Sequence, residues 1–541
     1  MLGLMQDAPL TITSILDRAE RLWPTREVVT MTATGTERAT YADLATEVRR
    51  QAAALDALGI SADGRVASFA WNTFRHLALY YSIACSGRVL HTGNIRYFPD
   101  QLVYTFNHAE DEAVFVDRSI LGLLAPLLPQ LTTLRHVVVM DDGAPTPLPD
   151  DPRVVLYSDV VGETESDLEG RITDEHQAAG ICYTSGTTGN PKGVVYTHRS
   201  NWLHALSSLS SSNFGLTDSD RILPVVPFFH ANGWGFAHSP LMGGASLVLP
   251  GPNLQPAALV DMMEAERVTV AAGVPTIWMG VAPLLEGRDL SALRTVICGG
   301  SAVPVSLSET WRDAIGLPIT QAWGMTEMSP LGSVCAPRAE VEAMSEAEQI
   351  EVRATAGFMA PGVEWRIVDP TTRAELPWDG ETSGELEVRG PWIARQYYRT
   401  DEPGEQFSPD GWLRTGDVAA VTPLGYLKIV DRTKDLVKSG GEWISSVAVE
   451  NAIMAHPAVA EAAVVAMPHP KWGERPLAFA VVREGQTLTK EELVGFLGER
   501  LGKWQVPDDV VFIDEVPKTS VGKFSKKTLR EKYAGYVLPT S

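Results

Sequence analysis

Two hydrophobic patterns alternate through the first half of the chain. Apolar positions recur at helical spacing from Ile12 to Leu22 and, more strongly, from Tyr41 to Leu55. Short runs rich in β-branched residues lie between such segments and predict strands at 65–70, 113–116, 136–140, 221–226, 245–249, 268–272 and 295–298. Helices are expected at 74–86, 256–266 and 304–315. This alternation predicts two open, mostly parallel α/β sheets, with a loop rich in Pro, Asp and Gly at 141–151 between the two lobes.

The pattern changes after Gly357. Apolar and polar residues alternate at 363–369, 384–389 and 426–430, with turns between them, which predicts a small antiparallel sheet or barrel. Strands at 460–466 and 477–482 follow, and then an amphipathic helix at 490–501 with Thr489 as its N-cap. The last part of the chain is therefore expected to be a compact α+β unit, with a domain boundary near Asp431.

Length and charge narrow the class of protein. A chain of 541 residues is too long for one core. Its 67 acidic and 45 basic residues give a formal net charge of −22, which argues against non-specific nucleic-acid binding. The sequence has no run of 18 apolar residues, and its first ten residues lack the pattern of a signal peptide, so no membrane span and a cytoplasmic location are expected. The four cysteines are scattered and are expected to be reduced thiols.

A segment from Tyr183 to Gly193 concentrates hydroxyl side chains, glycines and a lysine between two apolar runs. Glycines let successive backbone N–H groups converge on one anion, while hydroxyls and an ammonium add donors and charge. The segment suits a polyphosphate, but it is not a Walker loop, because Lys192 precedes the glycine and β-branched residues follow. The alternative is a flexible polar surface turn. The candidate phosphate-binding residues are Thr184, Ser185, Gly186, Thr187, Thr188, Gly189 and Lys192.

Further motifs follow, and each has a plainer interpretation when it is taken alone. A Thr-Glu pair can start a helix, and an isolated histidine in an apolar run is often a core residue. A charge near a turn is usually exposed, and a lysine-rich tail is usually a solvated face. The motifs lie at 227–234 (PFFHANGW), 299–304 (GGSAVP), 321–328 (QAWGMTEM), 411–417 (GWLRTGD), 429–442 (IVDRTKDLVKSGGE) and 517–523 (PKTSVGK).

Taken together and in this order, the motifs from Tyr183 to Lys523 resemble those of the adenylate-forming superfamily. That superfamily includes acyl-CoA synthetases, luciferases and peptide-synthetase adenylation domains. The resemblance implies an N-terminal adenylation domain at 1–431, built of two αβ-layered subdomains and a small β-barrel-like subdomain. A small, mobile α+β domain at 432–541 would follow and rotate between two half-reactions. The implied activity is that of an AMP-forming acyl-CoA ligase that uses ATP, Mg²⁺ and coenzyme A.

The resemblance also assigns a nucleotide site residue by residue. Thr326 would contact the α-phosphate, and Glu327 together with Thr184 would hold Mg²⁺, which prefers oxygen ligands. Asp417 would accept hydrogen bonds from the ribose hydroxyls, with Arg432 on the same side. The adenine side would be formed by Trp323, in place of the superfamily's usual tyrosine, and by Gly300, Ser301, Ala302, Gln321, Ala322 and Gly324.

The resemblance places the acid between His230 and Trp234. His230 would orient the carboxylate and gate the pocket, and Trp234 would form its floor beside Gly300. Because a bulky indole occupies the volume that a long acyl tail needs, a short or medium-chain acid is expected.

The tail of the chain would supply the remaining parts. Lys523 is the expected catalytic lysine, which contacts the reacting carboxylate and the α-phosphate, and Asp435 is the expected hinge. Lys438, Gly440 and Gly441 would lie on the face that turns inward for coenzyme A, where glycines let pantetheine pass close to the backbone. Arg475 and Lys526 are candidates for its 3′-phosphate.

Within the superfamily, the HANGW segment and the acidic stretch 340–351 resemble the medium-chain acyl-CoA ligases. The nearest resemblance is to bacterial methylmercaptopropionate-CoA ligases of dimethylsulfoniopropionate breakdown, which implies 3-(methylthio)propionate as the substrate. A general medium-chain fatty-acyl-CoA synthetase, a luciferase-like or carrier-loading enzyme and a catalytically silent nucleotide-binding protein stay open as alternatives, as does a homodimer. A serine hydrolase finds no support, because the sequence has no G-x-S-x-G elbow.

Overall fold

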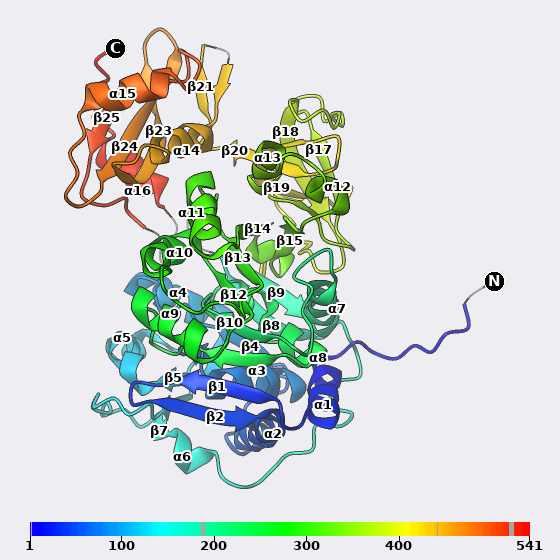
Figure 1. Ribbon diagram of the computed structural model, residues 1–541. Helices are drawn as coiled ribbons and strands as arrows, with labels where there is room; N and C mark the ends of the chain where they lie inside the picture. The colour runs from blue at the N-terminus through cyan, green and yellow to red at the C-terminus, as the bar shows by residue number, and fades with distance from the viewer. Residues whose placement is uncertain (2, 185–189, 441, 519–523, 541) are drawn as a thin grey trace.

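The computed structural model describes residue 1 and residues 3–184, 190–440, 442–518 and 524–540 (Figure 1). Two large sheets form the body of the molecule. The first has the strand order β7-β6-β5-β3-β4-β8-β9, in which neighbours are parallel except for the antiparallel pair β8–β9. Its strands are β3 (Arg65–Phe69), β4 (Val89–Thr92), β5 (Asp111–Asp117), β6 (His136–Met140), β7 (Val154–Leu156), β8 (Ala178–Tyr183) and β9 (Gly193–Thr197).

The second sheet has the order β16-β15-β14-β13-β12-β10-β11-β1-β2 and is parallel from β14 to β1, with antiparallel strands at both edges. Its strands are β1 (Glu27–Met31), β2 (Thr36–Thr40), β10 (Arg221–Pro224), β11 (Ser246–Leu249), β12 (Val270–Gly273), β13 (Thr295–Gly299), β14 (Ile319–Gly324), β15 (Leu331–Val334) and β16 (Phe358–Met359). The two expected α/β sheets are confirmed.

One detail of the expected layout was wrong, and one hairpin was not predicted. The loop at 141–151 does not separate the lobes, because β6 and β7 on its two sides are neighbours in the same sheet. The N-terminal hairpin β1–β2 joins the second sheet, where Val28 of β1 pairs with Leu247 of β11. A strand pairing between segments so far apart leaves no local pattern in the sequence.

Helices cover the sheets and fill the space between them. Helix α3 (Phe74–Cys85) contacts β3, β4 and β8 of the first sheet and β1 of the second. From His76 to Cys85 all its residues are buried, as expected of a helix that is covered on every side. The other helices of the body are α1 (Ile12–Leu22), α2 (Tyr41–Ala57), α4 (Pro99–Ala109), α5 (Leu121–Leu124), α6 (Tyr157–Val160), α7 (His198–Leu209), α8 (Ser239–Gly243), α9 (Pro256–Ala265), α10 (Pro275–Val281) and α11 (Val305–Ile315).

A small antiparallel sheet with the order β17-β18-β19-β20 follows, as expected from the alternating pattern. Its strands are β17 (Glu364–Val368), β18 (Ser383–Arg389), β19 (Leu413–Val421) and β20 (Leu427–Arg432). The acidic stretch before it forms α12 (Ala339–Glu342) and α13 (Glu346–Arg353).

The C-terminal unit, which we define as residues 437–540, has its own sheet and its own buried cluster. Its strands are β21 (Val437–Ser439), β22 (Glu442–Ile444), β23 (Val459–His469), β24 (Gly473–Val482) and β25 (Asp509–Phe512), and its helices are α14 (Ser446–Met454), α15 (Lys490–Gly498) and α16 (Lys526–Lys532). Thr489 caps α15, as expected, by accepting a hydrogen bond from the backbone of Glu492.

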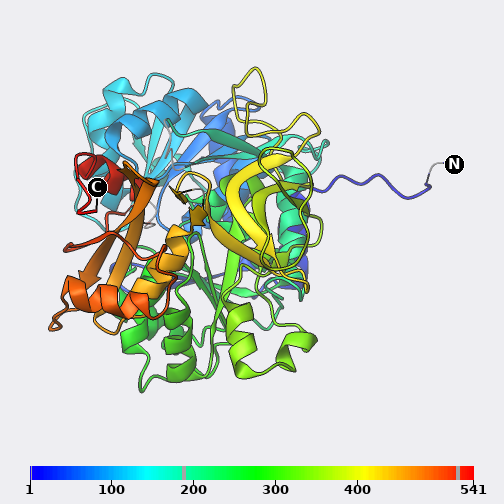
Figure 2. The same ribbon diagram turned by 90° about the horizontal axis from the view of Figure 1, so that it is seen from above.

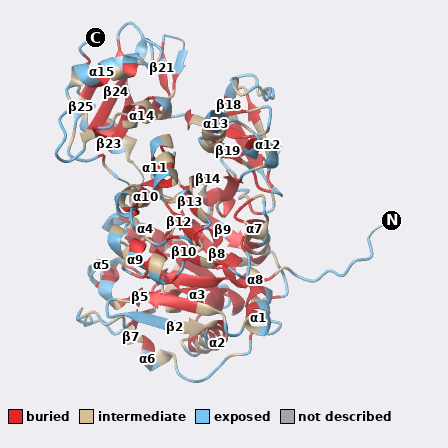
Figure 3. Cartoon of the chain, in the orientation of Figure 1, coloured by how far each residue is buried: buried red, intermediate tan, exposed pale blue. Residues whose placement is uncertain are grey.

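The small antiparallel sheet and the C-terminal unit lie side by side over one end of the body (Figures 1 and 2). Helix α16 faces the body, and β21 lies at the far end of the C-terminal unit (Figure 1). Most strands of the two large sheets are buried, whereas the edge strand β2 and the outer surfaces of the covering helices are exposed (Figure 3). In the described part of the chain, no helix is both long enough and apolar enough to cross a membrane.

Candidate active site

A cavity of about 360 Å³ lies where β13 and β14 end. The carboxyl ends of strands are the usual ligand-binding edge of a parallel sheet. Segments far apart in the sequence meet here, including the ends of the phosphate-loop motif, the HANGW motif, the WGMTE motif and the residues after β20. The lining residues that the sequence predicted are Thr184, Lys192, His230, Trp234, Gly300, Ala322, Trp323, Gly324, Thr326, Glu327 and Arg432.

Two lining residues hold a buried carboxylate, that of Asp417, which does not itself line the cavity. The Trp323 indole N–H donates to Asp417 Oδ2 at 2.9 Å, and Arg432 Nε lies 2.5 Å from Asp417 Oδ1. Asp417 and Arg432 are cross-strand partners on β19 and β20, so the antiparallel register itself brings them together. The Asp417 carboxylate raises the pKa of Arg432, which therefore keeps its charge.

Glycine allows Trp323 to reach this position. The Trp323 ring packs on the backbone of Gly332, where an added Cβ would come within 2.5 Å of the ring. At Gly324 a Cβ would collide with the carbonyl oxygen of Pro330. A flat apolar face backed by close-packed backbone is the kind of surface on which a nucleobase stacks.

The phosphate-loop motif closes at its base. The backbone N–H of Thr184 donates to the Lys192 carbonyl at 2.9 Å, and the backbone N–H of Lys192 donates to Thr184 Oγ1 at 3.1 Å. Tyr97 donates its hydroxyl proton to the Thr184 carbonyl at 2.6 Å and fixes the entry to the loop. The predictions for Ser185, Gly186, Thr187, Thr188 and Gly189 lie outside the described residues.

Thr326 and Glu327 begin a short 3₁₀ turn, Thr326–Met328, directly after β14. Both are buried, and Glu327 Oε1 accepts a hydrogen bond from the Tyr397 hydroxyl at 2.6 Å. Among the described residues, no three His, Cys, Asp or Glu side chains cluster as a ready-made metal site. A single buried carboxylate such as that of Glu327 fits Mg²⁺, because this ion is usually held by one or two carboxylates together with substrate phosphates. Glu327 would provide the protein's carboxylate.

The HANGW motif forms an unusual buried turn. The φ angles of Ala231, Asn232, Gly233, Trp234 and Gly235 are 36°, 39°, 62°, 55° and 78°, all in the left-handed region. A run of non-glycine residues in this region is strained, and the surrounding structure must hold it in place. Asn232 Oδ1 accepts a hydrogen bond from Thr92 Oγ1 at 2.7 Å and anchors the turn to β4.

This turn points Trp234 into the cavity beside Gly299, where a Cβ would lie 3.2 Å from the indole. His230 precedes the turn and also lines the cavity. Phe214, which the sequence interpretation missed, also lines the cavity and stacks on Phe236 with ring centroids 5.6 Å apart. A lining that contains these aromatic rings suits a short apolar chain.

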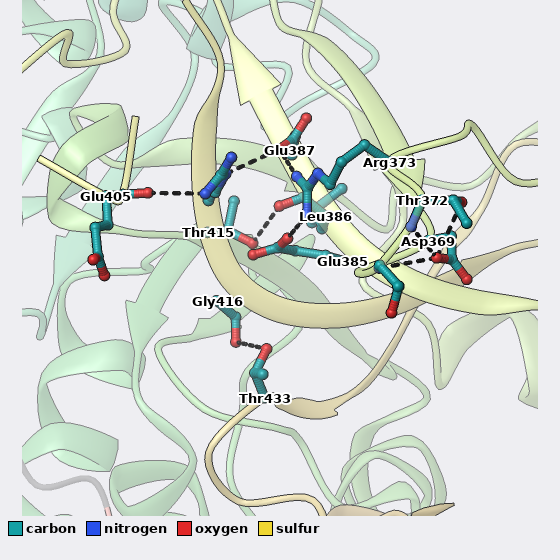
Figure 4. Close-up of polar contacts among 12 residues, drawn as sticks. Asp369, Thr372, Arg373, Glu385, Leu386, Glu387, Glu405, Thr415, Gly416 and Thr433 are labelled. Atoms are coloured by element: carbon teal, nitrogen blue, oxygen red, sulfur yellow. Dashed lines mark hydrogen bonds and ion pairs between the residues drawn. The ribbon is translucent and has the colours of Figure 1, made fainter. Parts of the chain in front are cut away.

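A charged network braces the strand that carries Asp417 (Figure 4). Glu387 is fully buried on β18, and its carboxylate contacts Arg366 at 2.7 Å and also Arg373. Arg414 of β19 lies 3.5 Å from the same carboxylate and lines the cavity. Next to it, Thr415 donates to the Leu386 carbonyl at 2.9 Å. The sequence did not predict Arg414, Thr415, Gly416, Thr433, Lys434, Tyr397, Gln406, Asn190, Met325, Pro330 or Leu331 as lining residues.

Other predicted residues do not line the cavity in this structure. Gln321 Nε2 donates instead to the Arg353 carbonyl at 2.9 Å. Ser301 and Ala302 are exposed before α11, and Lys438 and Gly440 lie on the β21–β22 side of the C-terminal unit. The predictions for Gly441 and Lys523 lie outside the described residues.

The hinge candidate and the two 3′-phosphate candidates make internal contacts. Asp435 Oδ1 accepts from Arg530 of α16 at 2.7 Å. Arg475 contacts Asp508 at 2.5 Å and Ser439 at 3.1 Å, and Lys526 contacts Glu450 at 2.8 Å. In this conformation Arg475 and Lys526 therefore stabilise the C-terminal unit.

Comparisons with known proteins agree with this geometry. The sequence pattern of the family described as AMP-binding enzyme matches residues 16–398, and that of the AMP-binding enzyme C-terminal domain matches residues 448–523. A 3-methylmercaptopropionyl-CoA ligase from Ruegeria lacuscaerulensis is 43% identical over 536 residues, covering 98% of this chain and 99% of the relative. A long-chain-fatty-acid–CoA ligase from Thermus thermophilus is 43% identical over 537 residues, covering 98% of this chain and 97% of the relative.

A medium-chain-fatty-acid–CoA ligase from Ectopseudomonas oleovorans is 40% identical over 544 residues, covering 100% of this chain and 99% of the relative. Among solved structures, the anthranilate CoA ligase AuaEII in complex with anthranoyl-AMP is similar with a TM-score of 0.86 and 25% identity. That similarity covers 98% of this chain and 100% of the solved one.

Proposed function

The chain belongs to the AMP-binding enzyme family, and on this premise we propose that it joins a short or medium-chain carboxylic acid to coenzyme A, with 3-(methylthio)propionate as its substrate. Its family and its full-length acyl-CoA ligase relatives make it an ATP-dependent acyl-CoA synthetase. The products are acyl-CoA, AMP and pyrophosphate.

The proposed reaction has two steps. A carboxylate oxygen of the acid attacks the α-phosphorus of ATP, and the bond to the β-phosphate oxygen breaks, which releases pyrophosphate. The thiol of coenzyme A then attacks the acyl carbon, loses its proton and displaces AMP. No side chain forms a covalent intermediate, so that positioning and charge stabilisation supply the rate enhancement.

The observation that carries this proposal is the combination of groups in the lining of one cavity. Trp323 and Arg432, which both hold Asp417, lie in this lining. The charged side chains of Lys192 and Glu327 and the aromatic rings of Phe214 and Trp234 line the same cavity. The base, the phosphate and the acyl group of an acyl-adenylate therefore each have a matching side chain, so the cavity suits this intermediate better than it suits a nucleotide alone.

Each charged group has a proposed task. Asp417 accepts hydrogen bonds from the ribose hydroxyls while Arg432 holds the carboxylate in place. The Lys192 ammonium binds phosphate oxygens, and His230 orients the acid. When bound, Mg²⁺ neutralises charge on the phosphates, and Glu327 with Thr184 would hold it.

The C-terminal domain is proposed to begin after Asp431 and to rotate about Asp435. Lys523 would contact the acid and the α-phosphate in the first step, and the face with Lys438, Gly440 and Gly441 would turn inward for coenzyme A in the second. The Lys523→Ala variant should therefore lose acid-dependent ATP–pyrophosphate exchange while it still binds ATP. Unimpaired exchange in that variant would refute the role of Lys523.

The substrate proposal rests on the aromatic residues that line the cavity, because sequence identity does not distinguish between the possible acids. The Ruegeria and Thermus relatives are equally identical to this chain, and their names give very different acids. Trp234 and Phe214 both occupy space that a long acyl chain would need.

Steady-state kinetics with purified protein test the substrate directly. The acids should run from acetate to palmitate and include 3-(methylthio)propionate, with AMP and acyl-CoA both measured. We expect the highest kcat/KM for 3-(methylthio)propionate or for acids of similar length. Similar values from butyrate to decanoate would favour a general medium-chain synthetase, and AMP formation without acyl-CoA would favour a luciferase-like or carrier-loading enzyme.

A catalytically silent nucleotide-binding protein is the alternative from another class. The sequence keeps Glu327, Asp417 and Lys523, which a degenerate copy could lose without consequence. ATP binding without pyrophosphate release for any acid would support this alternative. We also propose a cytoplasmic location, since ATP and coenzyme A are both available there, and leave a homodimer to be tested by light scattering.

A further inference from the structure

Tyr397 contacts two charged groups of the cavity lining, Lys192 and Glu327. Its hydroxyl donates to Glu327 Oε1 at 2.6 Å, and the Lys192 ammonium nitrogen lies 4.6 Å from the centre of its ring. The side chain is buried and lines the cavity. One aromatic residue therefore contacts both the lysine that follows the phosphate loop and the carboxylate proposed for Mg²⁺.

The backbone around Tyr397 is tied to both of these neighbours. The Ala394 N–H donates to the Glu327 carbonyl at 2.8 Å, and the Tyr398 N–H donates to the Gly193 carbonyl at 2.8 Å. On its other side the Tyr397 ring packs edge-on against Phe407, with centroids 5.6 Å apart. These contacts fix the position of the ring before any ligand arrives.

The Lys192 ammonium contacts the Tyr397 ring rather than a carboxylate. Among the described residues, no carboxylate oxygen lies within the 4.0 Å ion-pair distance of this ammonium. The ammonium rests on the aromatic face, where the attraction is weaker than that of a carboxylate. The second oxygen of Glu327 is not used in this hydrogen bond.

We propose that Tyr397 is a positioning residue that keeps Lys192 and Glu327 apart, so that the ammonium is available to phosphate oxygens and the carboxylate to Mg²⁺. If the two groups paired directly, each would have to break that ion pair before it bound MgATP. The proposal rests on the proposed function, since it assumes that MgATP binds in this cavity.

Two substitutions at Tyr397 separate its contact with Glu327 from its contact with Lys192. Tyr397→Phe keeps the ring under Lys192 and removes only the hydrogen bond to Glu327. Tyr397→Leu also removes the aromatic face and lets the ammonium approach the carboxylate. The matched control is Tyr398→Phe, because the neighbouring Tyr398 ring packs on His108, with centroids 5.5 Å apart, and does not line the cavity.

The main readout is equilibrium binding of ATP by titration calorimetry, with no acid present, at a series of Mg²⁺ concentrations. For Tyr397→Phe we expect a rise of about tenfold in the Mg²⁺ concentration that gives half of the maximal change in ATP affinity. This is the size expected for the loss of one hydrogen bond to a charged group, and metal-free ATP binding should stay unchanged. For Tyr397→Leu we expect metal-free binding to weaken as well. Tyr398→Phe should match the parent protein in both.

The same preparations give a kinetic check. Tyr397→Phe should raise the KM for MgATP and leave the KM for the acid unchanged, and a merely structural role would not produce this split. Parent-like Mg²⁺ dependence in Tyr397→Phe would overturn the inference, as would equal losses of ATP binding with and without the metal. If the parent protein itself bound ATP without forming an acyl-adenylate with any acid, the proposed function would fail instead.

Discussion

The indole N–H of Trp323 donates a hydrogen bond to Asp417 at 2.9 Å, which joins the proposed stacking face for adenine to the proposed acceptor for ribose. A tyrosine, the more frequent residue of the superfamily at this position, carries its donor at the far end of a different ring. The tryptophan in place of the usual tyrosine therefore has a structural role here, since Trp323 and Arg432 together hold both oxygens of the Asp417 carboxylate.

Replacement of Trp323 tests this link. Trp323→Phe keeps an aromatic face but removes the donor, so Asp417 loses one of its two fixed partners. We expect the KM for ATP to rise by about tenfold with little change in kcat, the size expected for one hydrogen bond to a charged acceptor. Trp378→Phe, at a tryptophan that is half exposed and stacked on Trp365, should leave the KM unchanged. An unchanged KM in Trp323→Phe would show that the indole contributes only its ring.

Phe214 should limit the length of the acid. Its loop is held by Arg294, which donates to the Gly215 carbonyl at 3.0 Å, and its ring stacks on Phe236, so the ring has a fixed position in the cavity lining. Phe214→Ala should enlarge the cavity and raise the ratio of kcat/KM for octanoate over propionate by about tenfold or more, since each accommodated methylene is worth about 1 kcal/mol or more.

Loss of a buried ring also destabilises the fold, by about 3 kcal/mol or more. Phe214→Leu therefore serves as a milder second variant, which should shift the ratio in the same direction. Phe98→Ala, at an exposed phenylalanine, is the control for general effects. A chain-length profile that is identical in all three variants and the parent protein would show that Phe214 does not limit the acid.

Contiguous motifs made much of this site predictable. The motif with Trp323 and Glu327 spans the end of β14, so its residues reach the carboxyl edge of the sheet as a group. Asp417 and Arg432 are adjacent in the antiparallel register, although separate motifs supply them. Order along the chain and type of residue were enough to predict that Trp323, Glu327 and Arg432 lie close together, and all three line one cavity.

The cavity residues that the sequence did not predict come from a different kind of segment. Tyr397 and Phe214 lie on loops, and they reach the cavity through backbone contacts to segments far away in the sequence. A single aromatic residue in a loop has no periodic pattern, so its environment depends on tertiary packing. The N-terminal hairpin was missed for the same reason, because β1 gains its strand partner only when β11 has been placed beside it.

Lys526 should be essential for the stability of the C-terminal unit. Its ammonium lies 2.8 Å from Glu450 Oε1 and donates to Ser446 Oγ at 2.6 Å. Ser446 in turn donates its backbone N–H to Asp431 Oδ2 at 2.6 Å, so this cluster also ties the unit to β20. Burial raises the pKa of Glu450, and nearby Lys526 opposes that shift.

Lys526→Met would leave buried carboxylates without their cation, at a cost of about 3–5 kcal/mol. We expect an earlier thermal transition and faster proteolysis within residues 437–540, while metal-free ATP binding to the body persists. The double variant with Glu450→Gln should regain part of the lost stability, because it removes the unpaired charge. If Lys526→Met were as stable as the parent, the Lys526 ammonium would not stabilise the buried carboxylates.

The last prediction concerns pH and the buried carboxyl group of Asp117, at the end of β5. Asp117 Oδ2 accepts the Trp71 backbone N–H at 2.8 Å, yet burial raises the pKa of Asp117 to about 7 from an ordinary value of 3.8. Because the folded state holds this proton more tightly than the unfolded state, the contribution of Asp117 is most favourable below its ordinary pKa. Stability is then lost as the pH rises through about 7.

Asp117→Asn keeps an acceptor for the Trp71 amide and removes the charge. The variant should therefore be more stable than the parent above neutral pH, by up to about 4 kcal/mol, since a shift of one pKa unit corresponds to about 1.4 kcal/mol. This advantage should shrink as the pH falls toward about 5, and denaturant unfolding at a series of pH values measures it. Asp401→Asn, on an exposed loop, should show no such trend. A stability difference for Asp117→Asn that did not depend on pH would mean that the carboxyl group stays ionised in the folded protein.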